Sequence, residues 1–162
     1  MKARQFYLLS IIALLAQCKA PEKQPLKMSQ LFSDNMVLQQ GVEVPVWGST
    51  IPTGEVKVEF RTQCVTTEAD DQGHWQLKLR PEQAGTGDSL LVTTENDTLR
   101  FRSVAVGEVW IASGQSNMEV QMINNWAPVD NAKEETANAK YPDIRLFIVN
   151  RNTSTYPIDT LI

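Results

Sequence analysis

The chain has 162 residues, a length that allows one domain or a small domain joined to part of another. Apolar residues make up 42% and charged residues 21%, which excludes a compositionally disordered chain. The formal net charge is −4 and the sequence has no basic patch, so nucleic acid is not expected as a partner.

The first twenty residues have the order of an export signal. Lys2 and Arg4 form a basic start, and the segment Phe6–Ala16 is apolar except for Ser10. This apolar run has the length of a signal-peptide core and is too short to span a bilayer. We expect residues 1–20 to be a signal peptide and the protein to be exported to the periplasm, outer membrane or exterior of a bacterium.

Two processing sites are compatible with this signal. The residues before Cys18 resemble a bacterial lipobox, which would make a lipid on Cys18 the protein's membrane anchor, although Gln17 departs from the usual small residue. The alternative is ordinary cleavage after Ala20. In both cases Cys64 has no partner for a disulfide framework, and its place after a β-like run predicts a buried, inert thiol.

Residues 21–30 contain two prolines and little apolar content, and we expect a linker there. From residue 31 to 103 apolar and polar residues alternate with period two, most clearly at Val42–Val46, Val56–Phe60 and Trp75–Leu79. Turn signals rich in Gly, Asp and Asn separate the runs. The pattern predicts an antiparallel β sandwich or barrel with one face of each strand inward.

Three residues of this region invite a functional interpretation. Trp47 and Trp75 could stack on sugar rings, but we favour packing because aromatic side chains suit strands and bury large areas. His74, the only histidine, follows the Gly73 turn and is expected to be solvated there.

The chemistry-bearing stretch follows residue 103. The apolar run Val104–Ala112 predicts a buried strand, and it ends at Ser113-Gly114 followed by Gln115, Ser116 and Asn117. Open α/β sheets place reacting groups at such strand ends, where Ser116 would present its hydroxyl and a backbone N–H to an oxyanion. The α/β-hydrolase elbow G-x-S-x-G is excluded because Met118 stands where that motif needs glycine.

The remaining residues predict the start of a βαβ unit. Met118, Met122 and Ile123 have helical spacing, so a short helix could follow the serine and favour an oxyanion at its amino end. A helix is predicted over 131–140, with Asn131 and Glu134 as a capping box. The apolar run 144–149 then predicts a second buried strand, and the βαβ crossover that joins the two strands is expected to be right-handed.

The block Gly107-Glu108-Val109-Trp110-Ile111-Ala112-Ser113-Gly114-Gln115-Ser116-Asn117-Met118 resembles the nucleophile block of the sialate O-acetylesterase family, a group of SGNH (GDSL-like) hydrolases. A second block, Leu31-Phe32-Ser33-Asp34-Asn35-Met36-Val37-Leu38-Gln39-Gln40, is also similar to that family. The resemblance implies that Ser116 is the nucleophile, with Gly114, Gln115 and Asn117 beside it. It also implies a β sandwich-like module over 31–103, followed over 104–162 by the truncated start of a flavodoxin-like α/β hydrolase domain.

The family resemblance implies an esterase that removes acetyl groups from O-acetylated sialic acids without cofactor or metal. Family proteins are longer, and their Asp-x-x-His block has no counterpart in these 162 residues. Asp143 and Asp159 have no histidine to orient, so we expect the chain alone to be inactive. Two alternatives stay open: a non-catalytic carbohydrate-binding or spacer β module, and an esterase for acetylated xylan or another polysaccharide.

Overall fold

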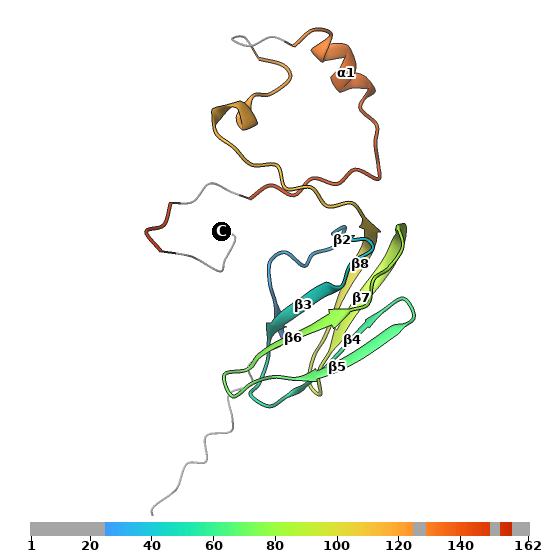
Figure 1. Cartoon of the computed structure of the whole chain (residues 1–162), viewed down its shortest axis with the longest axis vertical. Helices are drawn as coiled ribbons and strands as arrows, with labels where there is room; N and C mark the ends of the chain where they lie inside the picture. Colours follow the sequence, from blue (N-terminus) through green and yellow to red (C-terminus); the bar gives the residue numbers. More distant parts are fainter. Residues whose placement is uncertain (1–24, 125–128, 150–152, 157–162) are drawn as a thin grey trace, which may run out of the picture.

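The computed structural model describes residues 25–124, 129–149 and 153–156. Within these ranges the chain forms eight strands followed by a short 3₁₀ helix, η1, and one α-helix (Figure 1). In chain order the elements are β1 (Lys27–Met28), β2 (Val37–Gln39), β3 (Val44–Ser49), β4 (Glu55–Phe60), β5 (Gln63–Glu68), β6 (His74–Leu79), β7 (Gly85–Thr93), β8 (Thr98–Gly107), η1 (Ser116–Glu119) and α1 (Ala132–Asn138).

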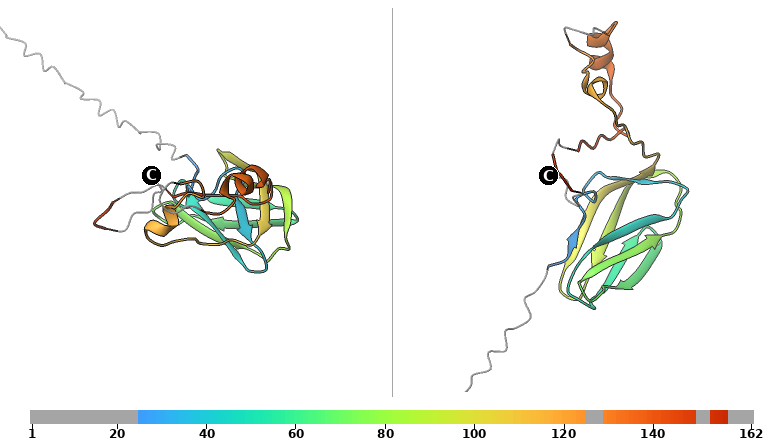
Figure 2. Two further views of the ribbon diagram at one scale, coloured as in Figure 1. Left: turned by 90° about the horizontal axis from the view of Figure 1, so that it is seen from above. Right: turned by 60° about the vertical axis from the view of Figure 1, so that its left-hand side comes forward.

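The strands form two sheets, an arrangement consistent with the predicted β sandwich-like module. One sheet has three strands in the order β1-β3-β6, and the other has five in the order β2-β8-β7-β4-β5. The two lie as layers with the core between them (Figure 2). Pairing is antiparallel throughout except for β2, which runs parallel to β8. That parallel pair was not expected.

The period-two pattern locates the core correctly. Along β4 the side chains Val56, Val58 and Phe60 are buried, and along β6 the same holds for alternate residues from Trp75 to Leu79. Each such side chain contributes roughly 1.5–3 kcal/mol by leaving water. The core is completed from β7 and β8 by Leu90, Val92, Val104 and Val106.

Both tryptophans pack as expected. Trp75 is 4% exposed, and the Trp47 ring meets Phe32 edge-on with 4.9 Å between centroids. His74 opens β6 just after a turn and its side chain is 67% exposed, which agrees with the solvated position expected for it.

Two expectations for the module are wrong. The expected linker ends early, since Leu26 is buried and β1 begins at Lys27. Only glycine at position 48 lets β1 approach β3, because a Cβ there would lie 2.2 Å from the Lys27 carbonyl oxygen. Cys64 is exposed rather than buried. It lies on the outward-facing register of the edge strand β5, next to buried Gln63.

The βαβ start predicted after residue 103 is also wrong in this structure. β8 ends at Gly107, so the strand predicted to Ala112 stops five residues early, and Trp110 and Ile111 are 85% and 92% exposed. Residues 144–149 form no strand, although the predicted helix exists as α1. A strand needs at least one neighbouring strand to complete its hydrogen bonds, and the described residues offer none to residues 108–112 or to residues 144–149.

The capping box predicted for α1 does not form. Asn131 precedes the helix with a left-handed φ of 57°, and its side chain makes no capping hydrogen bond. The signal segment and Cys18 lie outside the described residues, as does Asp159. In the part of the chain that is described, no helix is long and apolar enough to cross a membrane.

Acid should destabilise the module. Hydrogen bonds from the His74 and Gln72 backbone lower the pKa of Asp70, and those from Gln63 and Arg61 lower the pKa of Glu82. The unfolded chain binds these protons more tightly, so this stabilisation is present above the ordinary carboxyl pKa and is lost as pH falls through the lowered values.

We therefore expect the melting temperature of the module, followed by circular dichroism, to fall between about pH 7 and about pH 3. Asp70→Asn should remove part of that dependence, whereas the exposed variant Asp71→Asn serves as control. A melting temperature that stays constant or rises on acidification would contradict the sign.

Candidate functional site

The candidate nucleophile lies outside the sandwich. After Gly107 the chain leaves β8 (Figure 1). Every residue from Glu108 to Glu119 is exposed. Ser116 opens η1, whose turn is closed by the Met118 N–H donating to the Gln115 carbonyl over 2.9 Å. The structure thus brings Gly114, Gln115, Ser116 and Asn117 together in one exposed turn.

Gly114 has a packing role in this turn. A Cβ at this position would lie 2.7 Å from Met118 Cγ, closer than two such atoms can approach. The glycine therefore lets the Met118 side chain fold back over the backbone just before the serine.

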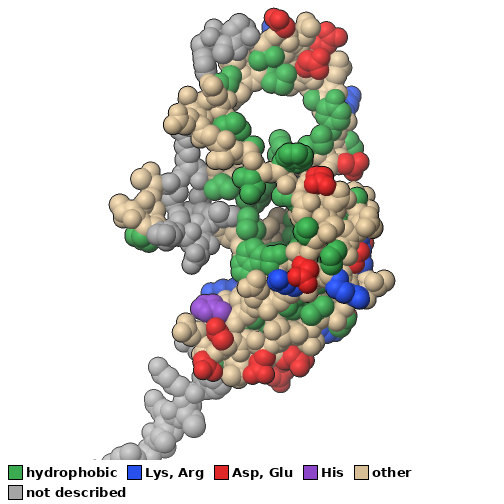
Figure 3. All heavy atoms as spheres, in the orientation of Figure 1, with side chains coloured by type: hydrophobic (Ala, Val, Ile, Leu, Met, Phe, Trp, Pro, Cys, Tyr) green, Lys and Arg blue, Asp and Glu red, His purple; other side chains and the backbone are tan. Residues whose placement is uncertain are grey.

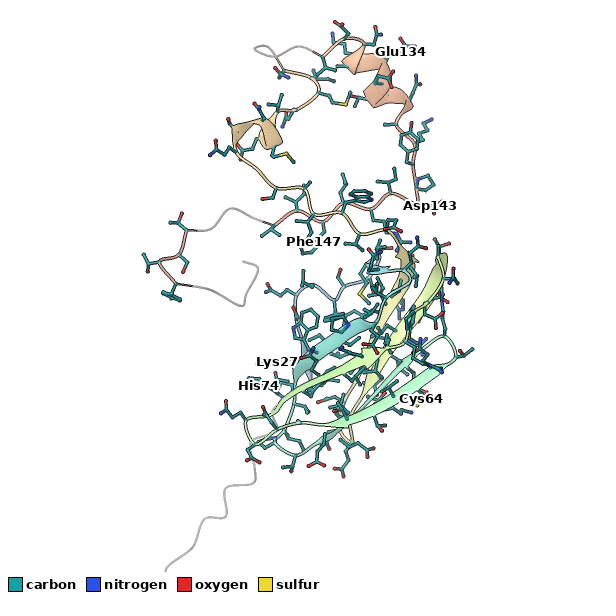
Figure 4. The ribbon with its side chains drawn as sticks, viewed as in Figure 1. Lys27, Cys64, His74, Glu134, Asp143 and Phe147 are labelled. Carbon is teal, nitrogen blue, oxygen red and sulfur yellow. The ribbon has the colours of Figure 1, made fainter. Side chains whose placement is uncertain are left out.

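The turn alone does not make a catalytic site. η1 is one turn of 3₁₀ helix with no buried residue and ends at Glu119, so the short helix expected through Met118, Met122 and Ile123 does not form and a helix dipole contributes little. Within the described residues the Ser116 hydroxyl has no hydrogen-bond partner. His74 lies at the end of the sandwich remote from the outgoing chain, near Lys27 (Figure 4). Asp143 is exposed and faces no histidine.

The strand that leads to the serine is fixed by the first of the two sequence blocks. β2 pairs with β8 in parallel, with Val37 opposite Ala105 and Gln39 opposite Gly107. The Gln40 N–H then donates to the Gly107 carbonyl over 2.9 Å. The blocks Leu31–Gln40 and Gly107–Met118, which the sequence presents as two separate motifs, are therefore in direct contact.

The contact continues beyond the strand through Glu108. Its carboxylate accepts hydrogen bonds from the side-chain amides of Gln39 (3.1 Å) and Gln40 (2.5 Å), and the Val109 N–H donates to Gln39 Oε1 over 2.8 Å. The hydrogen bonds from Gln40 and Gln39 hold the pKa of Glu108 below its ordinary value. Glu108 is thus ionised at neutral pH and fastened to β2.

A β-bulge interrupts β8 a few residues before Gly107. Val104 pairs with Asp88 but Phe101 pairs with Leu90, so β8 carries one extra residue, and Ser103 takes a left-handed φ of 54°. The first block satisfies this backbone. Asp34 Oδ1 accepts from the Arg102 N–H over 2.7 Å, and the Asn35 N–H donates to the Arg102 carbonyl over 2.9 Å.

The later part of the chain returns to the same bulge. Arg145 donates from its guanidinium to the backbone carbonyls of Met36 and Ser103, the first over 3.1 Å. Sequence reasoning missed Arg145, Glu108, Gln39 and Gln40. For Arg145 the available signal was a cation inside the apolar run Ile144–Val149; the other three stood inside the recognised blocks without an assigned role.

The described residues contain no other strong candidate site. A groove of about 380 Å³ is lined by Thr50, Ile51, Gly54, Glu55, Lys57, Thr93, Thr94, Glu95, Asn96 and Asp97, none of which belongs to the serine block. In the ranges that the structure describes, no group of three or more His, Cys, Asp or Glu side chains is placed to hold a metal ion.

Comparison with known proteins gives this geometry a context. No family profile matches the chain. The chain is 31% identical to the sialate O-acetylesterase of Mus musculus over 143 residues, which covers 80% of the chain, and 28% identical to that of Homo sapiens over 148 residues, which covers 84%. By sequence, the chain belongs to the sialate O-acetylesterase family.

The chain spans about a quarter of its curated sialate O-acetylesterase relatives, 26% of the mouse protein and 28% of the human one. A solved structure agrees with the assignment. A carbohydrate acetylesterase from Xanthomonas citri superposes with a TM-score of 0.59 at 36% identity, over 60% of this chain and 22% of that one. The relationship to carbohydrate esterases therefore holds in both sequence and fold.

Proposed function

We propose that this chain carries the serine nucleophile of a carbohydrate O-acetylesterase and that the ester is an acetyl group on a sialic acid hydroxyl. The observation that supports the proposal is the contact between the two family blocks, which attaches the first residues of the Gly107–Met118 block to β2 and Gln40. The sialate O-acetylesterase relatives supply the substrate class.

In the proposed reaction the Ser116 oxygen attacks the acetyl carbonyl carbon while a general base takes its proton. The ester bond breaks, the sugar oxygen leaves with a proton, and water later releases acetate from the acetyl-serine. Backbone N–H groups of the turn would stabilise the oxyanion. His74, the one histidine of these 162 residues, lies at the end of the sandwich remote from the outgoing chain, so we place the general base in another polypeptide segment.

The Xanthomonas citri neighbour favours a second substrate, because its description is a carbohydrate acetylesterase without reference to sialic acid. Acetylated xylan or another acetylated polysaccharide would use the same attack at the acetyl carbonyl. The purely carbohydrate-binding alternative has less support, because Trp75 is buried in the core and the half-buried Trp47 ring packs against Phe32. The proposal also keeps export through the amino-terminal signal, with Cys18 as the candidate lipid anchor.

The experiment measures acetate release from O-acetylated sialic acid and from acetylated xylan. One arm uses the chain alone, and the other a chimaera in which it replaces the aligned segment of the mouse sialate O-acetylesterase. We expect background rates from the chain, equal to those of its Ser116→Ala variant, and turnover from the chimaera. Binding of these sugars by the chain together with an inactive chimaera would support the binding-module alternative instead.

A further inference from the structure

The chain leaves one edge of the sandwich at the end of β8 and returns to the same edge at Arg145. Figure 1 shows the chain rising from the end of β8, passing η1 and α1, and coming back across the same edge. Glu108 marks the outgoing end and Arg145 the returning end. Ser116 lies between them, so its position depends on what holds both ends.

Apolar packing does not hold them. Trp110, Ile111 and Leu146 are 85%, 92% and 87% exposed, and the space-filling view shows apolar side chains open at this crossing (Figure 3). Solvent-exposed side chains of this kind add little to the free energy of docking. Hydrogen bonds must therefore hold the two ends of the segment at this edge of the sandwich.

At the outgoing end the contacts are reciprocal. Both oxygens of Glu108 are engaged, one by Gln39 and one by Gln40, while Gln39 also accepts from the Val109 N–H. Hydrogen bonds to an ionised acceptor are about twice as strong as neutral ones. Three bonds on adjacent residues fix the direction in which the chain leaves β8.

At the returning end one side chain makes the attachment. Arg145 is the only residue of Tyr141–Val149 that is not classed as exposed. It reaches the carbonyls of Met36 and Ser103, and its second terminal nitrogen lies 3.5 Å from Ser103 Oγ. The planar guanidinium suits two divergent carbonyls, and the bulge at Ser103 turns one of them toward it.

We infer that Glu108 and Arg145 are positioning residues, two ends of a clamp that sets the place of Ser116 relative to the β module. The module is then part of the catalytic apparatus, because its β2–β8 edge is the surface on which the nucleophile segment is mounted. The catalytic meaning of the clamp rests on the proposed function, but its existence does not. It can therefore be tested without any turnover.

The test is a distance measurement between spin labels. One label sits on the natural, exposed thiol of Cys64 on β5 and the other on Ser116→Cys, with Cys18→Ser to leave two sites. With the clamp intact we expect a narrow distance distribution. Glu108→Ala and Arg145→Met should each broaden it about twofold or more, because a released loop explores many positions on fast timescales.

Two further variants separate the clamp from general damage. Arg145→Lys keeps a cation that can still donate to the carbonyls and should restore much of the narrow distribution. Arg100→Met removes an exposed arginine of β8 that takes no part in the clamp, and it should leave the width of the distance distribution unchanged. Circular dichroism of each variant checks that the sandwich is folded.

Distributions of equal width in the parent, Glu108→Ala and Arg145→Met would overturn the inference, as would broadening by Arg100→Met of the same size. Failure of the proposed function has a different signature. In that case the chimaera would lack Ser116-dependent turnover while the spin-label distances still responded to the clamp variants.

Discussion

Replacing Ser116 by alanine in the chimaera with the mouse relative is expected to lower acetate release by roughly four to six orders of magnitude, since loss of a nucleophilic serine has effects of this size in other hydrolases. The reason is that the Ser116 hydroxyl would form the covalent bond to the acetyl carbon, and alanine has no group that could replace it. The measurement is kcat/KM for an acetylated sialic acid.

Ser113 provides the matched control. It lies three residues earlier in the same exposed segment, so Ser113→Ala removes a hydroxyl of the same kind from the same surroundings. We expect that variant to keep activity within about tenfold of the parent. Near-normal turnover in Ser116→Ala would show that another residue attacks the ester.

The second large effect concerns the stability of the module. Phe60→Ala should lower the free energy of unfolding by about 3–5 kcal/mol, the usual cost of removing a buried aromatic ring and leaving a cavity. Phe60 is 1% exposed at the end of β4, where it pairs with Leu90 on one side and Gln63 on the other. Urea denaturation followed by circular dichroism gives the value.

The control for this variant is Glu55→Ala at the exposed start of the same strand, which should change the free energy of unfolding by no more than about 0.5 kcal/mol. A loss below about 1 kcal/mol in Phe60→Ala would mean that the core between the sheets is not closed around this ring.

The sequence was sufficient for the elements whose pattern is local. Alternation at Val56–Phe60 and Trp75–Leu79 identified both the strands and their buried faces, because a strand's side-chain period is fixed by its backbone. β2 was harder. Its three residues form too short a run to show a period, and its parallel partner lies far along the chain, so nothing local announces the pairing.

The errors share a physical cause. Apolar content predicted strands over Val104–Ala112 and 144–149, but a strand exists only where another strand completes its hydrogen bonds. β8 has such partners as far as Gly107, and the residues after it do not. The prediction that Cys64 is buried was wrong for a different reason, because successive residues of a strand face outward and inward in turn.

The motif in the sequence identified the candidate site. The hydrogen bonds that attach this segment to the sandwich were not predicted. The turn around Ser116 was predictable because a dozen adjacent residues match one family block. The hydrogen bonds of Glu108 with Gln39 and Gln40 join residues almost 70 positions apart. Arg145 donates to the backbone carbonyls of Met36 and Ser103. Because every residue has a backbone carbonyl, the sequence does not indicate which residues accept these hydrogen bonds.

The most direct test of the central claim is covalent labelling of the chimaera with a fluorophosphonate, a reagent that reacts with activated serines, followed by peptide mass spectrometry. We expect one adduct, on Ser116, together with loss of acetate release in proportion to labelling. We expect no adduct on Ser113 under the same conditions. An adduct on a different serine that accompanies inactivation, with Ser116 unmodified, would contradict the assignment of this segment as the nucleophile block.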